Sequence, residues 1–548
     1  MTESTSGPLF SIVTPVYDPP IDVLEDTIAS VLDQDLDDWE WILVDDLSPT
    51  EAVRETIRAH AARDPRIRLH EREVNGHIVA ASNDGLAQAT GEFLVFLDHD
   101  DLLTPDALSR NAELIAEHPE VDYLYSDEDK VDGDGRLYDE FAKPAWSPER
   151  LRGQMYTSHL SVMRTEVVRR VGGFRHGYDG SQDHDLALRV SEVARRVVHV
   201  PHVLYHWRAV VGSASADIHA KPYATIAGQN AVQDHLDRLG IPAEVEQGPA
   251  PGHYRVTRRL DPSVRVSVVI PTIGQSALIW GARRVMVVEA VRSLIEKTSH
   301  EDLEIVVVHD RPTPPAVLER LREVAGDRLV LQPFDKPFNY SEKMNVGCLR
   351  ASGERLVFLN DDVEVISEGW LEQLVAPLDE PDVGLTGAML RFSDGSVQHA
   401  GHAYAGGHYL HPHIFEPSGS YGAFGALVIN REVSGVTAAC AAMRRGTFLE
   451  IGGFAEELPA NFNDVDLCYK VRATGCRIVW VAGCELYHFE SRSRERMVHD
   501  WERDLVRSRW GVPRDDDYTR PATSRRSRRL PARLALAQEQ RQPERHQP

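Results

Sequence analysis

The sequence predicts an α/β protein made of two similar domains, each built around a mostly parallel central sheet. The first observation is an alternation of short apolar runs with amphipathic stretches, which is typical of buried parallel strands and their covering helices. The second is that the same series of signals occurs twice in the same order. The third is a content of 42% hydrophobic residues with nine Trp in 548 residues, which excludes a wholly disordered chain.

The first series begins near the N-terminus. We expect an apolar strand at 10–18, an amphipathic helix at 21–32 and a second strand, WEWILVDD, that closes at Asp45 and Asp46. A further helix leads through the Asn-containing segment 75–92 to a third strand, FLVFLDHDD. Strand, helix, strand, helix and strand with short connections predict a right-handed open sheet.

The second series repeats these elements in the second half of the chain. A strand is expected at 265–272, a helix at 285–297, and a strand, LEIVVVHD, that closes at Asp310. The segment 338–354 matches 75–92, and a third strand, RLVFLNDD, again ends in acid.

Agreement continues downstream of these strands. Each half contains Gly-Gly-Phe followed by a pair of acids, which includes Asp183 in the first half and Asp464 in the second. From Asp183 to His206 is 23 positions, and from Asp464 to His488 is 24 positions. Matching order and spacing over separate signals predict two related domains.

The connection between the halves has helical periodicity and then a Pro- and Gly-containing stretch, QGPAPGHY. We therefore divide the chain into a disordered N-terminus (1–7), a first domain (8–215), a helical segment and linker (216–262), a second domain (263–515) and a basic flexible tail (516–548).

The charge balance bears on partners and location. The net charge of −25 argues against a protein that coats nucleic acid. Five Cys without a CxxC pair favour reduced thiols, and we find no uncharged apolar run of about 18 residues, so we expect a cytoplasmic protein. The segment 519–548 carries eight Arg and two Glu, and a lipid-linked acceptor would bring such a chain to the inner face of the membrane.

Carboxylates gather where the predicted strands end. In an open parallel sheet these ends share one crevice, so Asp98 and Asp100 should lie near Asp46, and Asp361 and Asp362 near Asp310. Oxygen ligands at this spacing suit Mg²⁺ or Mn²⁺ shared with phosphates, although a single acid pair equally suits a turn or a helix N-cap. No Gly-rich phosphate loop follows either first strand, which disfavours dinucleotide oxidoreductases, P-loop enzymes and nucleotidyltransferases.

These stretches together resemble the inverting family 2 glycosyltransferases of the GT-A fold, and in particular the two-domain bacterial enzymes of surface-polysaccharide assembly. The matching motifs are TPVYD, ILVDDLS, the run from NGHIVAASNDG to FLDHDD, YSDEDK, GSQDHDLALR, VSVVIPT, FNYSEKMNVG, VFLNDDVEV, DGSVQHAGH and FNDVDLCYKVRATG. The resemblance extends from Pro8 to about Trp510.

The resemblance implies a nucleotide-sugar donor site in each domain and a glycan or lipid-linked glycan acceptor. The implied donor-binding residues are Thr14, Pro15, Tyr17, Asp46, Asp98, Pro271, Thr272, Asp310, Asn360 and Asp361. The implied ligands of Mg²⁺ or Mn²⁺ are Asp98, Asp100, Asp362, His206 and His488. An ordinary half-buried histidine is an equal alternative for His206.

Inversion at the anomeric carbon needs one base that deprotonates the acceptor hydroxyl. The resemblance assigns this role to Asp183, with Asp464 as its counterpart. A helix N-cap is the alternative for such acids, and Asp185 or Asp466 would then cap while its neighbour reacts.

The second domain departs from the family pattern. Asn360 replaces the first acid of the strand-end triplet, His309 precedes Asp310, and the insertion IGQSALIWGARRVMVV lengthens the first crevice loop. These departures predict a different donor. The alternative is that one domain is catalytic and the other is a degenerate module that binds donor or glycan.

Several residues are candidates for the acceptor side: Trp146, His159, Gln182, His399 and Asn463. A core position is the alternative for Trp146. His399 belongs to a His-rich stretch, AGHAYAGGHYLHPH with its flanks, for which a flexible acceptor-side loop is favoured over a zinc site, and YSDEDK is its expected counterpart in the first domain.

Overall fold

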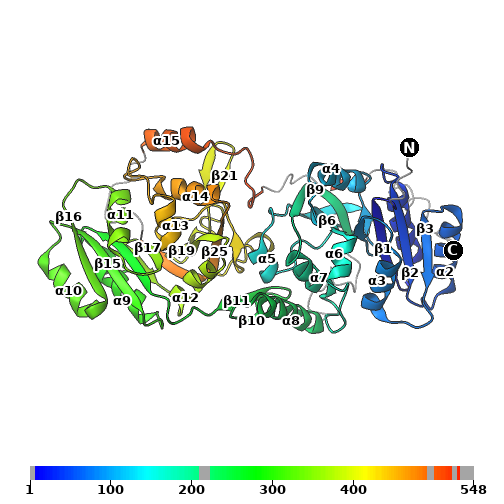
Figure 1. Cartoon of the computed structure of the whole chain (residues 1–548), viewed down its shortest axis with the longest axis horizontal. Coiled ribbons are helices and arrows are strands. Elements are labelled where there is room, and N and C mark those ends of the chain that lie inside the picture. Colours follow the sequence, from blue (N-terminus) through cyan, green and yellow to red (C-terminus); the bar gives the residue numbers. More distant parts are fainter. Residues whose placement is uncertain (1–6, 209–221, 490–498, 521–527, 531–548) are drawn as a thin grey trace, which may run out of the picture.

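The computed structural model describes residues 7–208, 222–489, 499–520 and 528–530. The N-terminus predicted to be disordered and most of the Arg-rich segment therefore lie outside the described residues. Figure 1 shows two α/β bodies side by side along the long axis, the first coloured blue to cyan and the second green to orange. In the described part of the chain, no helix is long and apolar enough to cross a membrane.

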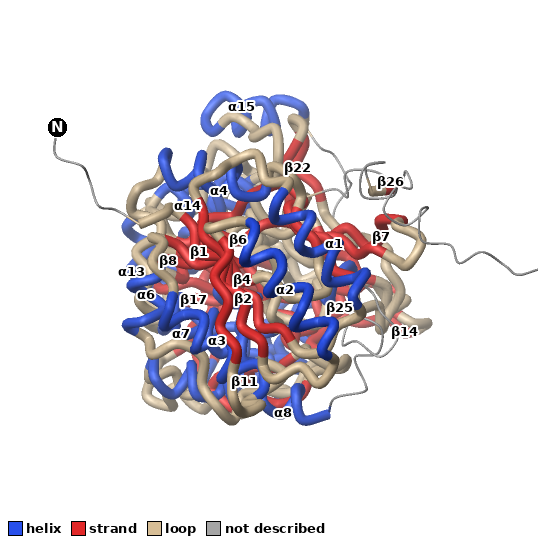
Figure 2. The backbone as a smooth tube through the Cα atoms, turned by 90° about the vertical axis from the view of Figure 1, so that its right-hand side faces the viewer, coloured by secondary structure: helices blue, strands red, loops and turns tan. Residues whose placement is uncertain are grey.

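The first sheet begins with four parallel strands in the order β3-β2-β1-β4. Their bounds, with those of the helices between them, are β1 (Phe10–Val16), α1 (Ile21–Leu32), β2 (Trp39–Asp45), α2 (Glu51–Arg63), β3 (Ile67–Glu71), α3 (His77–Gln88) and β4 (Phe93–Phe96). Every residue of β2 is buried, as expected for a strand covered on both faces. Helices α1 and α2 cover one face and α3 the other, and Figure 2 shows α1 beside α2.

Antiparallel strands extend the first sheet toward the middle of the molecule. Strand β8 pairs with β4, β6 with β8 and β7 with β6, while β9 runs parallel to β6. The elements of this half are β5 (Leu102–Leu103), α4 (Ala107–Glu117), β6 (Tyr123–Val131), β7 (Arg136–Phe141), α5 (Pro148–Gly153), β8 (Ser161–Arg164), α6 (Thr165–Arg170), α7 (Gln182–Ser191) and β9 (Val197–Arg208).

The second domain repeats this topology. Its order, β16-β15-β12-β17-β24-β19-β25, matches β3-β2-β1-β4-β8-β6-β9 of the first domain, with the same parallel and antiparallel pairs. The predicted α/β class and the predicted pair of similar sheets are confirmed. The insertion IGQSALIWGARRVMVV forms a hairpin of two short strands and enters α9.

The bounds of the second domain follow the same series. They are β12 (Val266–Thr272), β13 (Ser276–Ile279), β14 (Ala282–Val285), α9 (Met286–Glu296), β15 (Leu303–Asp310), α10 (Pro315–Ala325), β16 (Leu329–Phe334), α11 (Tyr340–Arg350), β17 (Arg355–Leu359), β18 (Val363–Val365), α12 (Trp370–Val375), β19 (Val383–Arg391), β20 (Val397–His399), β21 (Ala403–Ala405), β22 (His408–Leu410), β23 (Arg431–Glu432), β24 (Cys440–Arg444), α13 (Arg445–Glu450), α14 (Asn463–Ala473), β25 (Arg477–His488) and α15 (Asp500–Trp510). Between the domains lie α8 (Pro222–Leu239) and the hairpin of β10 (Ala243–Gln247) and β11 (Tyr254–Arg258).

A repeated pair of hydrogen bonds explains the Gly-Gly-Phe motifs. In the first domain, the Asn83 amide on α3 donates to the Phe174 carbonyl and accepts the Phe174 N–H, both at 2.9 Å. Asn345 makes the same two bonds to Phe454, at 3.0 and 2.9 Å. A Cβ at the preceding glycine, which has a positive φ, would lie 2.6 Å from the Asn oxygen in both domains. Glycine is therefore required there, and the two bonds fix the loop that leads to α7 or α14.

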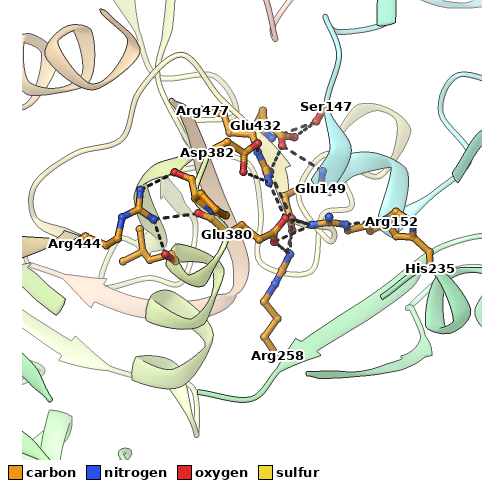
Figure 3. A network of polar contacts seen from close by, with 12 residues as sticks. Ser147, Glu149, Arg152, His235, Arg258, Glu380, Asp382, Glu432, Arg444 and Arg477 are labelled. Atoms are coloured by element: carbon orange, nitrogen blue, oxygen red, sulfur yellow. Dashed lines mark hydrogen bonds and ion pairs between the residues drawn. The ribbon is translucent and has the colours of Figure 1, made fainter. Parts of the chain in front are cut away.

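Buried charges join the two domains. Figure 3 shows Glu149 of α5 in contact with Arg152 and with Arg258 of β11, and Arg258 and Arg477 both reaching Glu380 of the second domain. The Arg258–Glu149 and Arg258–Glu380 contacts are 2.5 and 2.6 Å. Burial alone would raise the pKa of Glu149, but Arg258 and Arg152 hold it well below its ordinary value. Glu149 is therefore ionised, and its charge is compensated within the interface.

The C-terminal segment departs from the predicted flexible tail where it is described. Arg472 contacts Asp517 at 2.5 Å, and the Ala145 N–H of the first domain donates to the Asp517 carbonyl at 2.7 Å. Arg520 pairs with Asp127 at 2.7 Å, and strand β26 (Arg528–Arg529) adds to β7 of the first sheet. The prediction missed these contacts because sequence composition does not show that a Pro-containing, Arg-rich segment has acidic and strand-edge partners.

We expect Arg258→Ala to destabilise the full chain by up to about 3–5 kcal/mol, because it removes one of the positive charges that compensate the buried Glu149 and Glu380 and leaves them only Arg152 and Arg477. The urea unfolding midpoint of the full chain measures this loss. Arg255→Ala is the control, because Arg255 lies on the same strand but is exposed and 4.0 Å from an exposed Glu246. Equal effects of the two substitutions would contradict the importance of the buried network.

Candidate active sites

One cavity of about 990 Å³ in the second domain collects the residues predicted for its site. It opens at the carboxyl ends of β12, β15 and β17, where an open parallel sheet is expected to bind ligands. Its lining includes every residue predicted for this domain: Pro271, Thr272, Asp310, Asn360, Asp361, Asp362, His399, Asn463, Asp464 and His488.

Lys343 is a cavity residue that the sequence analysis missed. It lies on α11 with almost no exposed surface, contacts Asp310 Oδ1 at 2.9 Å and donates to the Thr272 carbonyl at 3.0 Å. The Thr272 hydroxyl in turn donates to Asp361 at 2.6 Å. Lysine in a helix usually faces solvent, so only the position of FNYSEKMN opposite two strand ends could have indicated this role.

Two acids, Asp361 and Asp362, lie side by side just after β17, and Asp361 titrates differently from a free carboxylate. Burial and the neighbouring Asp362 raise the pKa of Asp361 to about 7. Both acids stay ionised near neutral pH only if positive charge compensates them. The cavity of the second domain, called the second cavity below, therefore favours a cation or a proton at Asp361 and Asp362.

His488 is placed to share such a cation with Asp362. Its Nδ1 lies 2.7 Å from Gln398 Oε1, which accepts the ring N–H, and its Nε2 lies 3.2 Å from Asp362 Oδ1. A ring nitrogen that donates to a neighbouring oxygen while the other nitrogen faces a carboxylate is typical of metal-binding histidines. The chemistry of these donors fits the predicted divalent ion.

The two predicted bases sit at equivalent helix starts. Asp464 is in the first turn of α14, and burial raises its pKa. The acid two positions later pairs with an arginine in both domains: Asp185 with Arg189 at 2.6 Å, and Asp466 with Arg509 at 2.8 Å. Among the described residues no side chain caps either helix, so neither motif acid is the expected N-cap. The second acid anchors a neighbouring Arg, and the first faces the cavity.

The first domain has a much smaller cavity, of about 30 Å³, at the corresponding place. Asp98, His159 and Asp183 line it. Burial and the charge of Asp98 raise the pKa of Asp183 to about 6, and Gln182 donates to its carboxylate at 3.0 Å. The structure thus brings together four predicted residues: the base Asp183, the donor-side Asp98, and the acceptor-side candidates His159 and Gln182.

The acids around Asp98 form a different group from the predicted one. Ligand atoms of Asp98, Asp101 and His159 lie within 4.8 Å of one another, whereas neither Asp100 nor His206 belongs to this group. Asp101 accepts the Tyr205 hydroxyl at 2.5 Å.

His206 nevertheless resembles His488 in its surroundings. Its Nδ1 lies 2.5 Å from Asp129 Oδ1, which leaves Nε2 as the nitrogen for any ligand. Burial raises the pKa of Asp100, as expected beside the charged Asp98. The donor set around Asp98 therefore fits a divalent ion, and all of its ligands, Asp98 included, stay a prediction.

The predicted donor pocket of the first domain needs one correction. The Thr14 side chain is fully buried and its hydroxyl accepts the Trp41 indole N–H at 2.9 Å, so it belongs to the core. Asp46 accepts the Gly76 N–H at 2.9 Å and also contacts Arg72, a residue that the sequence analysis missed. Of the other residues predicted for this pocket, Tyr17 is 52% exposed, and the Pro15 carbonyl lies 3.0 Å from His99 Nδ1.

The acceptor-side candidates of the first domain have distinct surroundings. Trp146 is half-buried against Tyr123, Tyr125 and Tyr156, which matches the alternative of a core position. The YSDEDK motif lies in the buried strand β6 rather than in a polar loop.

His159 is fixed by the motif residue Glu128, which accepts the His159 N–H at 3.1 Å and pairs with the buried Lys143 at 3.0 Å. The His-rich stretch of the second domain is likewise ordered: it contains β20, β21 and β22, and His399 and His402 are buried. The expectation of a loop needs correction at His399 and His402, whose rings are buried and hydrogen-bond inside the domain, whereas His408 and His411 are exposed.

Comparison with known proteins identifies the class. Residues 11–172 and 267–452 both match the family model Glycosyl transferase family 2. The two segments cover more than half of the chain and coincide with the two repeats, so the chain belongs to this family.

Individual relatives are longer than this chain. An uncharacterized protein, y4gI, of Sinorhizobium fredii is 40% identical over 531 residues, which cover 94% of this chain and 57% of that protein. The O-antigen biosynthesis protein RfbC of Myxococcus xanthus is 37% identical over 524 residues, which cover 94% of this chain and 40% of that protein. The chain thus spans roughly half the length of these relatives.

Solved structures give a distant likeness. S. aureus TarS 1-349 in complex with UDP-GlcNAc is 21% identical, with a TM-score of 0.34 over 41% of this chain and 66% of that chain. A TM-score this low supports no inference about the site.

We expect Asp183 to titrate near pH 6 in the metal-free chain, where free Asp titrates at about 3.9. Carboxyl NMR of ¹³C-Asp-labelled protein measures this, with Asp183→Asn used for assignment. Asp98→Asn should lower the pKa of Asp183 by removing a like charge, and Mg²⁺ should lower it in wild type if the ion binds at Asp98. A value near 4 without metal, or no response to either change, would contradict this account.

Proposed function

We propose that the chain is a metal-dependent, inverting glycosyltransferase with two catalytic centres, which transfers sugars from nucleotide-sugar donors to a growing bacterial cell-surface glycan. The observation that carries this proposal is the second cavity, where the residues predicted for donor, metal and base face one space of about 990 Å³. The first domain supports it by placing Asp183 next to Asp98 in an equivalent position.

Asp183 and Asp464 are the proposed bases. An inverting transfer needs a carboxylate within about 3 Å of the acceptor hydroxyl, on the side of the sugar opposite the leaving diphosphate. A pKa raised toward neutral strengthens the base without keeping it protonated at neutral pH. The helix starts at 182 and 463 fix these side chains, and the Asn-to-Phe hydrogen bonds hold the preceding loops.

A divalent ion, Mg²⁺ or Mn²⁺, would be held by Asp362 and His488 in the second domain and by Asp98 with neighbouring ligands in the first. Such an ion neutralises the negative charge that develops on a departing nucleoside diphosphate. Lys343 adds a fixed positive charge beside Asp310 in the donor half of the second cavity. The first domain has Arg72 beside Asp46, so the two centres present different donor contacts.

The surface-glycan assignment draws on the relatives. RfbC of Myxococcus xanthus is named for O-antigen biosynthesis, and an Escherichia coli chondroitin synthase is 27% identical over 239 residues. Acceptors of this class are glycans or lipid-linked glycans.

A second candidate is that only one domain is catalytic. The contrast between cavities of about 30 and 990 Å³ favours this alternative, with the first domain as the module that binds donor or glycan.

We expect Asp183→Asn and Asp464→Asn each to lower the rate of a different transfer by roughly 10²- to 10⁴-fold, because each substitution removes one base. Assays of each glycosidic bond with defined donors separate the two reactions. Asp237→Asn, on an exposed face of α8, is the control. If Asp464→Asn alters glycan affinity while every bond forms at the normal rate, the two-centre proposal is wrong.

We further propose that the protein works in the cytoplasm and associates peripherally with the inner membrane face through the Arg-rich segment. Replacing Arg525, Arg526 and Arg533 by Gln should weaken co-sedimentation with anionic vesicles at least 10-fold, because each Arg near such a surface contributes about 1 kcal/mol. Neutral vesicles are the control. Unchanged co-sedimentation would remove the basis of this proposal.

A further inference from the structure

Three histidines converge in the wall of the second cavity. His399, His402 and His411 each offer a ring nitrogen, and these atoms lie within 4.8 Å of one another. His399 and His402 are buried, whereas His411 is exposed, and all three line the cavity that also contains Asn463 and Asp464. The rings are nearly perpendicular, with interplanar angles of 73° to 89°.

Backbone hydrogen bonds fix the tautomer of His399. Its Nε2 lies 3.3 Å from the Gly401 N–H and 3.2 Å from the Thr437 N–H, and both groups donate to it. A backbone N–H is only a donor, so Nε2 must present its lone pair. Burial and the neighbouring His402 and His411 hold the pKa of His399 well below its ordinary value, so the ring is neutral. Its single hydrogen is therefore on Nδ1.

This assignment passes to His411. Nδ1 of His399 lies 3.2 Å from Nδ1 of His411. Because Nδ1 of His399 carries a hydrogen, Nδ1 of His411 is the acceptor of the hydrogen bond between them. Neutral His411 then carries its own hydrogen on Nε2. Two backbone amides thus determine, through His399, which nitrogen of the exposed ring is a donor.

The same hydrogen bonds argue against a zinc site. A histidine that binds metal through one nitrogen normally donates the N–H of the other to an oxygen. His399 is in the opposite situation, because two donors already face its Nε2. The cluster fits a chain of hydrogen bonds better than three metal ligands.

We propose that His411 binds the acceptor sugar through its Nε2–H beside Asp464, and that His399 is the positioning residue that orients the ring. A sugar hydroxyl accepts one hydrogen bond while it donates its own hydrogen, so a donor and a carboxylate acceptor that line one cavity suit such a hydroxyl. His411 and Asp464 line the same cavity. This inference rests on the proposed catalytic role of the second domain.

Substitutions at His411 test the donor position. His411→Gln keeps an N–H near the place of Nε2, whereas His411→Ala removes it. We expect His411→Ala to raise the KM for the acceptor about 5- to 10-fold, as for one lost hydrogen bond, with the donor KM unchanged and with substantial rescue by Gln. His408→Gln is the control, because His408 is exposed on the same hairpin and outside the cavity lining.

Substitution of the buried ring tests positioning. His399→Ala should raise the acceptor KM like His411→Ala, and the double variant should add little, because both changes break one chain. A purely structural role would instead lower stability and affect the donor and acceptor alike. Additive effects in the double variant would overturn the chain.

Histidine-selective ¹⁵N NMR of the full chain reads the tautomers without any activity assay. We expect Nδ1–H on His399 and Nε2–H on His411, and His399→Ala should abolish the single tautomer of His411. Nε2–H on His399 would overturn the inference. So would stoichiometric Co²⁺ binding, seen by its visible absorption, that His399→Ala removes.

The two proposals fail in different ways. If Asp464→Asn leaves every transfer unchanged, the second domain is not catalytic and the role of His411 falls with it. If Asp464→Asn abolishes a transfer while the acceptor KM is unchanged in His411→Ala, only the inference about His411 is wrong.

Discussion

Carboxylates crowded at the carboxyl end of a buried parallel sheet are the constraint on which this structure depends. The β17 end brings Asp361 next to Asp362, and the β4 end brings Asp98 near Asp101; burial raises the pKa of Asp361 and of Asp101. Each domain places positive charge or hydrogen-bond donors around its acids. Lys343 pairs with Asp310 in the second domain, and the Arg208 N–H donates to Asp101 in the first. The divalent ion that we propose for these sites would add to this compensation by neutralising charge on a donor diphosphate.

The features found in both domains are those in which a substitution would break a hydrogen bond or cause a steric clash. Both domains keep the Asn-to-Phe hydrogen bonds and the glycine that they require, and both place an acid at the start of the next helix. Around this shared frame the domains differ, since the His cluster and Lys343 are found in the second domain and Arg72 beside Asp46 in the first. The buried charges around Glu149 then join the two domains.

Much of the fold and part of the site could be predicted because periodicity and strand-end acids are local signals. The repeat together with the family resemblance points to Asp464, Asp362 and His488 as candidate site residues, and the three line one cavity. The errors concern side-chain direction, which local pattern does not show. The Thr14 hydroxyl turns to Trp41 inside the sheet, and His399 of the His-rich stretch is buried and accepts the N–H of the distant Thr437. Lys343 was missed because its partners lie on other strands.

The number of donor sites per chain tests the central claim most directly. Calorimetric titration of the full chain with a panel of nucleotide sugars, in Mg²⁺ or Mn²⁺, gives this number for each donor. Two centres with different donor contacts predict two sites in total, one weakened by Asp98→Asn and the other by Asp362→Asn. A single site lost in one variant and untouched in the other would contradict catalysis by both domains.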